Sequence, residues 1–250
     1  MPERDKAFSV SVIQVMNKNP AYGTGRLAIK LKVSGQKVQR IKKKFNLYPL
    51  RSKRKPKKRR DLNQEQTQYP NLTKNLLVLN PRTVYASDFT YIPFKGKFVY
   101  LATVIDIFSR EIVGWQISTR HTASLVKSAL LDALQRTGSS PEIIHSDQGS
   151  EYRSQEYQKF LAVNEIKPSM SSKSSPWQNG FQESFYGGFK EDLWDTKHYQ
   201  SLGELTEAIH QTINYYNKER IHTALRMSPQ EFFNENQKKS VETKEGLRIA

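Results

Sequence analysis

Cysteine is absent from the 250 residues of the chain. This absence excludes disulfide scaffolds, thiol catalysis and zinc sites with cysteine ligands, and it is compatible with a reducing compartment. The sequence also lacks an apolar run of the roughly 18–20 residues that a membrane-spanning helix requires. The charged start, Met-Pro-Glu-Arg-Asp-Lys, is followed by no apolar stretch, so we expect no secretory signal.

Acidic residues are scarce in the first third of the chain. Residues 1–80 contain 20 Lys and Arg but only 4 Asp and Glu, whereas residues 81–250 contain 20 of each. The whole net charge of +16 therefore lies in the first 80 residues. This asymmetry predicts a basic module that binds a polyanion such as nucleic acid, joined to a neutral working domain. A solubilising or ribosome-contacting tail would show the same excess of basic over acidic residues.

Residues 1–50 are expected to form a small basic helical domain. Val38 and Ile41 are spaced as on one helix face, with Lys and Arg around them. With a preceding helical segment and the Ser34-Gly35 turn, the pattern matches a helix-turn-helix, whose second helix can enter the major groove. An ordinary basic helical hairpin is an equal alternative. The DNA contacts expected in this domain are Arg40, Lys43 and Lys44.

Eight of the ten residues at 51–60 are basic, and polar residues follow them. No hydrophobic core can form there, so the sequence predicts an exposed linker over 51–80. Its cations can bind DNA phosphates by releasing counterions. The candidate contacts are Arg54, Lys57 and Lys58, although a localisation signal has the same composition.

From Val84 onward the sequence predicts a mixed α/β domain. Three segments rich in β-branched and aromatic residues, with short connections, favour an antiparallel meander. Apolar spacing then indicates a helix, a strand, a second helix, another strand and further helices. The expected strands are 84–93, 97–108, 111–118, 141–146 and 166–171, and the expected helices are 122–137, 154–163, 181–194 and 202–217.

Three carboxylates occupy positions at which a site can form. Asp88 lies in the first strand, Asp147 directly follows the fourth, and Glu183 lies in the first turn of a helix. If the three converge, their oxygens suit Mg²⁺ or Mn²⁺, and two such ions could activate water or a 3′-hydroxyl in phosphoryl transfer. An equal alternative is that the aspartates cap turns and Glu183 starts its helix, where the dipole favours an acid. For Asp106 we expect a structural role at its turn.

Five motifs surround these acids. They are D-F-T-Y-I (88–92), Y-L-A-T-V-I-D-I-F-S-R-E-I-V-G-W (100–115), H-S-D-Q-G-S-E-Y (145–152), E-S-F-Y-G-G-F-K (183–190) and Y-N-K-E-R-I-H-T-A-L-R-M-S-P-Q-E-F (216–232). In this order, with 58 and 35 residues separating the three acids, they resemble DDE transposases with a retroviral-integrase-type core. The chain resembles most the OrfB-type transposases of insertion-sequence family three, strongly over 81–233 and more loosely over 20–50.

The resemblance implies an RNase H-like mixed β-sheet flanked by helices. This core would span 81–235, with a C-terminal tail at 236–250. The family's activity is two-metal-ion cleavage and transfer of DNA strands at the ends of a mobile element. The metal-ligand role, for two Mg²⁺ or Mn²⁺ ions, carries over to Asp88, Asp147 and Glu183. Lys190, seven residues after Glu183, is expected to hold a DNA phosphate, and Asn179 is a further candidate contact.

The expected partners are double-stranded DNA, comprising terminal inverted repeats and target, and further copies of the chain on that DNA. An upstream OrfA protein, separate or fused, is a third expected partner, whereas no membrane is expected. The resemblance implies a bacterial cytoplasmic protein associated with the nucleoid. Two rival functions are a DNA-binding regulator with an inert core and an RNase H-like nuclease that cuts without joining. Divalent-ion binding tests the first rival, and joined products test the second.

Overall fold

The computed structural model describes residues 3–50, 68–172, 179–193 and 195–246. The chain divides into two compact units. Unit 1 comprises the described residues of 1–56, 189–194 and 214–250, and unit 2 comprises those of 57–188 and 195–213. The sequence places the start and end of the catalytic core at 81 and 235. In the structure, residues 189–194 and 214–250 are grouped with the N-terminal helices in unit 1. Within the described residues, no helix is long and apolar enough to cross a membrane.

Unit 1 begins with three helices, in the region where the sequence predicts a small helical domain. They are α1 (Glu3–Lys18), α2 (Thr24–Lys30) and α3 (Gly35–Lys44). Their apolar faces share one core, in which Val12, Leu27 and Ile41 are completely buried. Helix α3 begins after Ser34, whose hydroxyl accepts the backbone N–H of Lys37 and so satisfies a donor that the helix leaves unpaired. Unit 1 ends with α9 (Pro229–Gly246), which continues into the segment for which the sequence predicts a tail.

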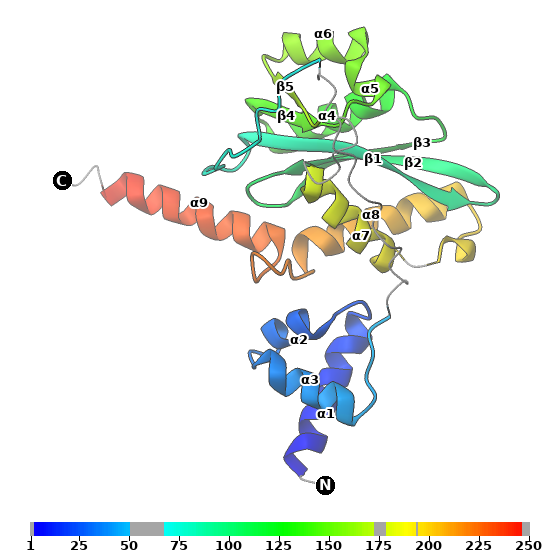
Figure 1. Cartoon of the computed structure of the whole chain (residues 1–250), viewed down its shortest axis with the longest axis vertical. Helices are drawn as coiled ribbons and strands as arrows, with labels where there is room; N and C mark the ends of the chain where they lie inside the picture. Colours follow the sequence, from blue (N-terminus) through cyan, green and yellow to red (C-terminus); the bar gives the residue numbers. More distant parts are fainter. Residues whose placement is uncertain (1–2, 51–67, 173–178, 194, 247–250) are drawn as a thin grey trace. The chain divides into compact units, whose positions relative to one another are not determined.

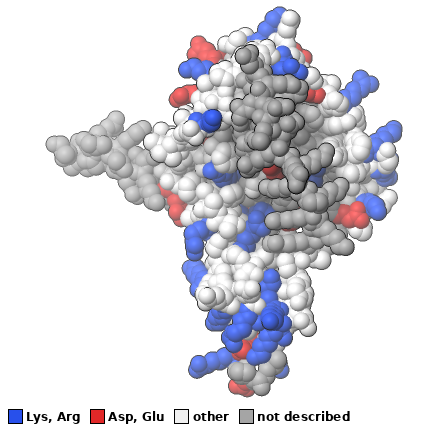
Figure 2. Space-filling view, viewed as in Figure 1, with Lys and Arg blue, Asp and Glu red and all other residues white. Residues whose placement is uncertain are grey.

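On the face shown in Figure 2, Lys and Arg far outnumber Asp and Glu on the three N-terminal helices. Residues 3–50 contain 11 Lys and Arg and 2 Asp and Glu. One of the acids, Asp5 of α1, pairs with Arg40 and Lys44 of α3 at 2.8 and 2.6 Å. The hydrogen bond from Lys44 holds the pKa of Asp5 below its usual value. Two of the cations predicted to contact DNA therefore also hold α1 to α3.

Unit 2 contains a five-stranded mixed sheet, as predicted. Its strands are β1 (Val84–Phe94), β2 (Lys97–Asp106), β3 (Ile112–Ser118), β4 (Ile143–Ser146) and β5 (Lys167–Met170). They lie in the order β3-β2-β1-β4-β5. The first three pair antiparallel, as the expected meander, whereas β4 pairs parallel to both β1 and β5. The carboxyl ends of β1, β4 and β5 therefore lie at the same edge of the sheet.

Helices cover both faces of this sheet (Figure 1). One face carries α4 (Ala123–Thr137), α5 (Ser150–Arg153) and α6 (Gln155–Val163), and the other carries α7 (Gly180–Asp192) and α8 (Leu202–Lys218). The main core lies under α4, where Ala129, Leu130 and Ala133 are completely buried. Helix α4 ends at Gly138, whose φ of 63° is the left-handed conformation that commonly terminates helices.

Gly114 of β3 allows α4 to pack directly on the sheet. A Cβ atom at this position would lie 2.4 Å from the carbonyl oxygen of Ala129 and 2.5 Å from the backbone nitrogen of Ala133. Both are backbone atoms, so neither can move aside as a side chain would. Only glycine permits this approach of strand and helix.

Several segments differ in detail from the prediction, and the strands expected at 97–108 and 141–146 are each two residues shorter in the structure. Helix α5 occupies residues that the sequence leaves as a loop, because four residues are too few to show a helical period. The β5 strand starts at Lys167 and ends at Met170, one residue inside each predicted end. Between the predicted strand 166–171 and the predicted helix 181–194, residues 173–178 lie outside the described residues.

Candidate active site

Asp88 and Asp147 occupy equivalent positions on neighbouring parallel strands. The β1–β4 pairing joins Val84 to Ile143 and Ala86 to His145. Extending this register by two residues places Asp147, which directly follows β4, opposite Asp88. Equivalent positions on parallel strands point to the same face of a sheet. The two carboxylates are therefore presented together, beside the carboxyl ends at which sites form in open α/β sheets.

The loop after β4 holds Asp147 in place. The backbone N–H of Gly149 donates to its Oδ1 at 2.8 Å. The residue is exposed, but surrounding protein atoms restrict the hydration of its carboxyl, and this desolvation raises the pKa of Asp147. The nearby negative charge of Glu151 raises it further. A cation at this carboxylate would relieve both effects.

The first turns of α7 are fastened over β1 by a buried amide. Gln182 is completely buried, and its Nε2 donates to the carbonyl oxygen of Ala86 at 2.7 Å. Its Oε1 accepts the hydroxyl of Thr103 in β2 at 3.0 Å. Because Thr103 pairs with Asp88 across the β1–β2 ladder, this contact fixes α7 over the strand position of that acid. Glu183, the residue after Gln182, is exposed at the start of the same helix.

Tyr186 makes a second attachment one turn later. Its hydroxyl donates to the backbone carbonyl oxygen of Asp88 at 2.7 Å and lies 2.8 Å from the hydroxyl of Thr103. Burial raises the pKa of Tyr186 well above its usual value, and the charge of Asp88 adds to the increase. The phenol is therefore protonated and able to donate. We call Gln182, Thr103 and Tyr186 the α7 network, because it couples the helix of Glu183 to the strand of Asp88.

The sequence did not indicate the α7 network. Thr103 lies within an apolar strand, and Gln182 and Tyr186 flank the predicted metal ligand. A signal was nevertheless available, since positions 182 and 186 are four residues apart and so share one face of a helix. Polar groups at that spacing on a buried face predict hydrogen bonds to the element beneath. The structural role predicted for Asp106 is confirmed, since its buried carboxylate accepts the Ser109 hydroxyl at 2.7 Å within the turn.

The three acids do not form a closed metal cage in the structure. Among the described residues, no three or more His, Asp or Glu side chains are close enough together to hold one metal ion. The structure presents Asp88 and Asp147 in register and fastens the helix of Glu183 over the same strand. The carboxylates match the hard oxygen ligands that Mg²⁺ and Mn²⁺ prefer. Donor chemistry and register fit such ions, whereas assembly of all three ligands stays a prediction.

The predicted DNA contacts fall into three groups. Lys43 and Lys190 are exposed, on α3 and α7 respectively. Arg40 and Lys44 pair with Asp5, but the Arg40 side chain keeps 59% of its surface exposed. Asn179 is only 5% exposed, which does not favour a direct contact with DNA. The remaining predicted contacts, Arg54, Lys57 and Lys58, lie outside the described residues.

The sequence matches two families described as integrase core domains. One match covers residues 79–176 and the other covers residues 164–229. An uncharacterized transposase-like protein of Haemophilus influenzae is 30% identical over 212 residues, which span 82% of this chain and 95% of that protein. The chain belongs to the insertion-sequence transposases. By class the transposase is a DDE-type polynucleotidyl transferase that acts on DNA.

Other comparisons agree with this family. The transposase for insertion sequence element IS904 of Lactococcus lactis is 40% identical over 167 residues, which cover 65% of this chain and 66% of that protein. Matches to transposases of IS3 elements confirm the resemblance to insertion-sequence family three. The catalytic core domain of HTLV-2 integrase, solved in complex with magnesium, is 24% identical with a TM-score of 0.52. The structural match covers 62% of this chain and 98% of the HTLV-2 core. This similarity confirms the RNase H-like fold of the transposase.

We expect the α7 network to contribute to stability as a unit. Thr103→Val and Tyr186→Phe should each lower the free energy of unfolding by about 1–3 kcal/mol, because each leaves a buried polar group unpaired. The double variant should lose less than the sum of the two, by about 0.5–1 kcal/mol or more. Chemical denaturation of the full chain measures this coupling. Tyr48→Phe, at a residue 73% exposed, is the control and should cost almost nothing. Strictly additive losses would contradict a shared network.

Proposed function

We propose that this transposase cleaves and joins DNA strands at the ends of its own mobile element, with Asp88, Asp147 and Glu183 as its metal ligands. The main support for this proposal is the β1–β4 register, which aligns Asp88 with Asp147. The attachment of α7 to the strand of Asp88 supports it, because it keeps the third acid near the same sheet position. The family supplies the reaction class, and these three residues supply its site.

Two Mg²⁺ or Mn²⁺ ions would be held by the three carboxylates. Bound there, such ions lower the pKa of a nucleophilic water or 3′-hydroxyl and stabilise the charge that develops on the leaving oxygen. The HTLV-2 integrase core was solved in complex with magnesium, which supports the choice of cation. The protein's own part is positional. The β1–β4 register sets the two aspartates, the Gly149 N–H orients Asp147, and the α7 network sets Glu183.

Residues 1–80, which carry the whole net charge of +16, would supply most of the affinity for duplex DNA. Their excess of cations attracts phosphates along the whole surface, and α3 is the second helix of the helix-turn-helix pattern. Lys190 would steady a phosphate beside the metal site without taking part in the chemistry. The DNA would comprise the terminal inverted repeats and the target, bound by more than one copy of the chain. An OrfA protein, separate or fused, would be a further partner.

Lys43 gives a specific test of DNA binding by α3. The logarithm of the DNA-binding constant K falls linearly with the logarithm of the salt concentration. In Lys43→Ala this negative slope should become shallower by about 0.9, because one phosphate contact is lost. Fluorescence anisotropy with duplex DNA at several salt concentrations measures the slope. The control is Lys159→Ala, which removes an exposed lysine of α6 in unit 2. Equal slopes for the wild type and both variants would exclude Lys43 as a phosphate contact.

The decisive assay follows the products of a labelled DNA substrate. Duplexes carrying the ends of the element that encodes the chain are incubated with full-length protein, a target plasmid, and Mg²⁺ or Mn²⁺. Strands joined to target DNA establish the proposed function, whereas nicked strands alone favour a nuclease. Specific binding without any cleavage, with and without the upstream OrfA protein, favours a regulator.

A further inference from the structure

Arg110 belongs to a tightly bonded turn between β2 and β3. Its backbone N–H donates to the carbonyl oxygen of Asp106 at 2.8 Å, and the backbone N–H of Asp106 donates to the carbonyl oxygen of Glu111 at 2.9 Å. The completely buried carboxylate of Asp106 accepts the Ser109 hydroxyl within the same turn. These bonds hold the backbone of Arg110 at a fixed place at the end of β2.

The backbone conformation of Arg110 is one that glycine adopts more readily. Its φ of 65° lies in the left-handed region, where a side chain meets steric hindrance and glycine does not. Such strain persists only where other interactions offset it. The group that glycine would lack at this position is the arginine side chain.

The Arg110 side chain ends on the first turn of α7. Its guanidinium carbon Cζ lies 3.9 Å from the centroid of the Phe181 ring, well within the roughly 6 Å over which a cation attracts an aromatic face. Phe181 is 36% exposed, whereas Phe185, one turn later on the same side of α7, is 2% exposed. The later turn is therefore packed in the core, and the first turn has Arg110 against its ring instead.

This contact supplies a support that the α7 network lacks. Gln182 and Tyr186 are four residues apart and lie along one line of the helix, so their hydrogen bonds leave the first turn able to roll about that line. Successive residues of an α-helix are turned by about 100°, which places Phe181 and Glu183 on opposite sides of Gln182. A hold on the Phe181 ring therefore resists the roll that would displace Glu183.

We infer that Arg110 is a positioning residue, which sets the direction of the Glu183 carboxylate by holding Phe181. This inference rests on the metal-ligand role proposed above for Glu183. Side-chain groups lie about 5–6 Å from a helix axis, so a roll of about 15° would move a carboxylate by roughly 1.5 Å. A misplacement of about 1 Å can cost roughly a hundredfold in rate. Arg110 acts through Phe181 and takes no part in the chemistry.

A direct contact between Arg110 and a DNA phosphate is the competing role. A phosphate contact requires only the cation of Arg110, and its loss weakens DNA binding. A positioning role requires the ring of Phe181 as well, and its loss slows the reaction of DNA that is already bound. Substitutions on both sides of the contact therefore separate the two roles.

Strand transfer by the full-length chain tests the inference, with the DNA concentration varied at fixed Mg²⁺. Arg110→Gly and Phe181→Leu should each lower the rate at saturating DNA by about tenfold or more. The DNA concentration that gives half the maximal rate should change by less than about twofold. The double variant should be about as slow as either single variant, because both remove the same contact. Phe181→Trp keeps an aromatic face for the cation and should retain most of the rate.

Two measurements on the protein without metal or DNA separate positioning from folding. Arg110→Gly should change the melting temperature by no more than about 3 °C, because glycine relieves the left-handed strain while the ring contact is lost. Hydrogen exchange of peptides that contain the first turn of α7 should become about fivefold faster or more in Arg110→Gly and Phe181→Leu. Exchange in α4 should stay unchanged in both variants.

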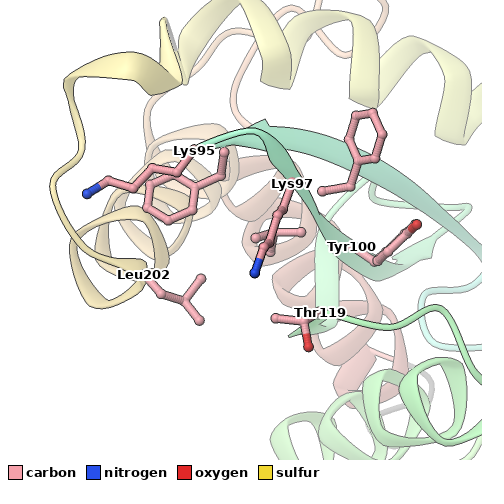
Figure 3. Close-up of a pocket in the computed structure, with 8 residues that line it drawn as sticks. Lys95, Lys97, Tyr100, Thr119 and Leu202 are labelled. Carbon is pink, nitrogen blue, oxygen red and sulfur yellow. The ribbon is translucent and has the colours of Figure 1, made fainter.

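Lys95→Gly is the matched control. Lys95 and Gly96 form the turn between β1 and β2, and Lys95 is also a cation in the left-handed conformation, with a φ of 47°. Figure 3 shows Lys95 beside a pocket of about 430 Å³, which Lys97 and Leu202 also line. The length of β2, about 30 Å, separates this turn from that of Arg110. Lys95→Gly removes the same charge and the same strain, and it should change neither strand transfer nor exchange in α7.

Four results would overturn the inference. The first is a normal rate of strand transfer in Arg110→Gly or in Phe181→Leu. The second is a loss in Arg110→Gly alone that a higher DNA concentration restores, which would make the arginine a phosphate contact. The third is unchanged hydrogen exchange in the first turn of α7. The fourth is a melting temperature lower by about 10 °C or more in both variants, which would make the contact a support of the whole fold.

The inference and the proposed function fail in different ways. If Arg110→Gly does not fold, Phe181→Leu compared with Phe181→Trp gives the same test. Normal joining by the variants removes the positioning role and leaves the proposed function in place. A wild-type protein that joins no strands removes the proposed function, and with it the role of Arg110 in strand transfer, even where hydrogen exchange shows that Arg110 holds α7.

Discussion

Replacing Asp147 with asparagine should reduce strand transfer by about a thousandfold or more, because the amide removes one charged oxygen ligand from ions that supply several kcal/mol of charge stabilisation. Asp88→Asn and Glu183→Gln should have effects of the same order. The remaining two acids cannot compensate, since each stands on a different element. Gel assays of joined products at fixed Mg²⁺ concentration measure the loss.

A matched control separates this effect from a general loss of negative charge. Glu142→Gln changes an exposed acid just before β4 and should leave strand transfer unchanged. Binding of duplex DNA, measured by anisotropy, should persist in all four variants, because most of the DNA affinity is predicted to come from residues 1–80. Near-normal joining by Asp147→Asn would remove this residue from the proposed metal site. If circular dichroism shows that Asp147→Asn does not fold, the more conservative Asp147→Glu is the variant to test. It keeps the charge but moves the carboxylate, so it tests the ligand geometry.

Gly114→Ala should cause the largest loss of stability. The new methyl group would meet the Ala129 carbonyl oxygen and the Ala133 nitrogen at about 2.5 Å, far inside contact distance, so strand and helix must separate. Overpacking of this kind costs about 3 kcal/mol or more when backbone must move. For a chain of this size, thermal unfolding should then start about 6–12 °C lower.

The control for this prediction is a glycine with space around it. A Cβ atom at Gly187 of α7 would meet no heavy atom within 4 Å, and its φ is not in the left-handed region. Gly187→Ala should therefore raise stability by up to about 1 kcal/mol, because alanine loses less backbone freedom in a helix. Equal melting temperatures for Gly114→Ala and the wild type would show that β3 and α4 do not pack as closely as described.

Local patterns made much of the fold predictable. The β-branched and aromatic residues at 97–108 favoured a strand, of which 97–106 form β2, and Leu125, Ala129 and Ala133 mark one face of α4. Pairing between distant segments carries no such local signal. Nothing in the four residues Ile143–Ser146 shows that they lie beside β1 and parallel to it, because parallel partners are joined by long connections. The family resemblance implied a mixed sheet, and the order of its strands came from the structure.

In the candidate site too, some residues could be predicted from the sequence and others could not. Asp88, Asp147 and Glu183 could be found from sequence because their surrounding motifs match a known family. Their relative placement depends on the β1–β4 register and could not be read from spacing. The α7 network was missed because hydrogen bonds among a glutamine, a threonine and a tyrosine depend on which faces meet. The pairing of Asp5 with Arg40 and Lys44 was missed for the same reason, since two helices must come together first.

The register of the β1–β2 hairpin also determines which codon insertions the gene can tolerate. Asp88 stands opposite Thr103, and successive strand residues alternate between the faces of the sheet. One extra residue inside either strand would turn every later side chain over, moving Thr103 away from Gln182 and Tyr186. An extra residue at Lys95-Gly96 would only lengthen the loop. Natural length variation and laboratory insertion libraries should therefore accumulate changes at the turn and avoid the strands, even though both lie within the same short stretch of coding sequence.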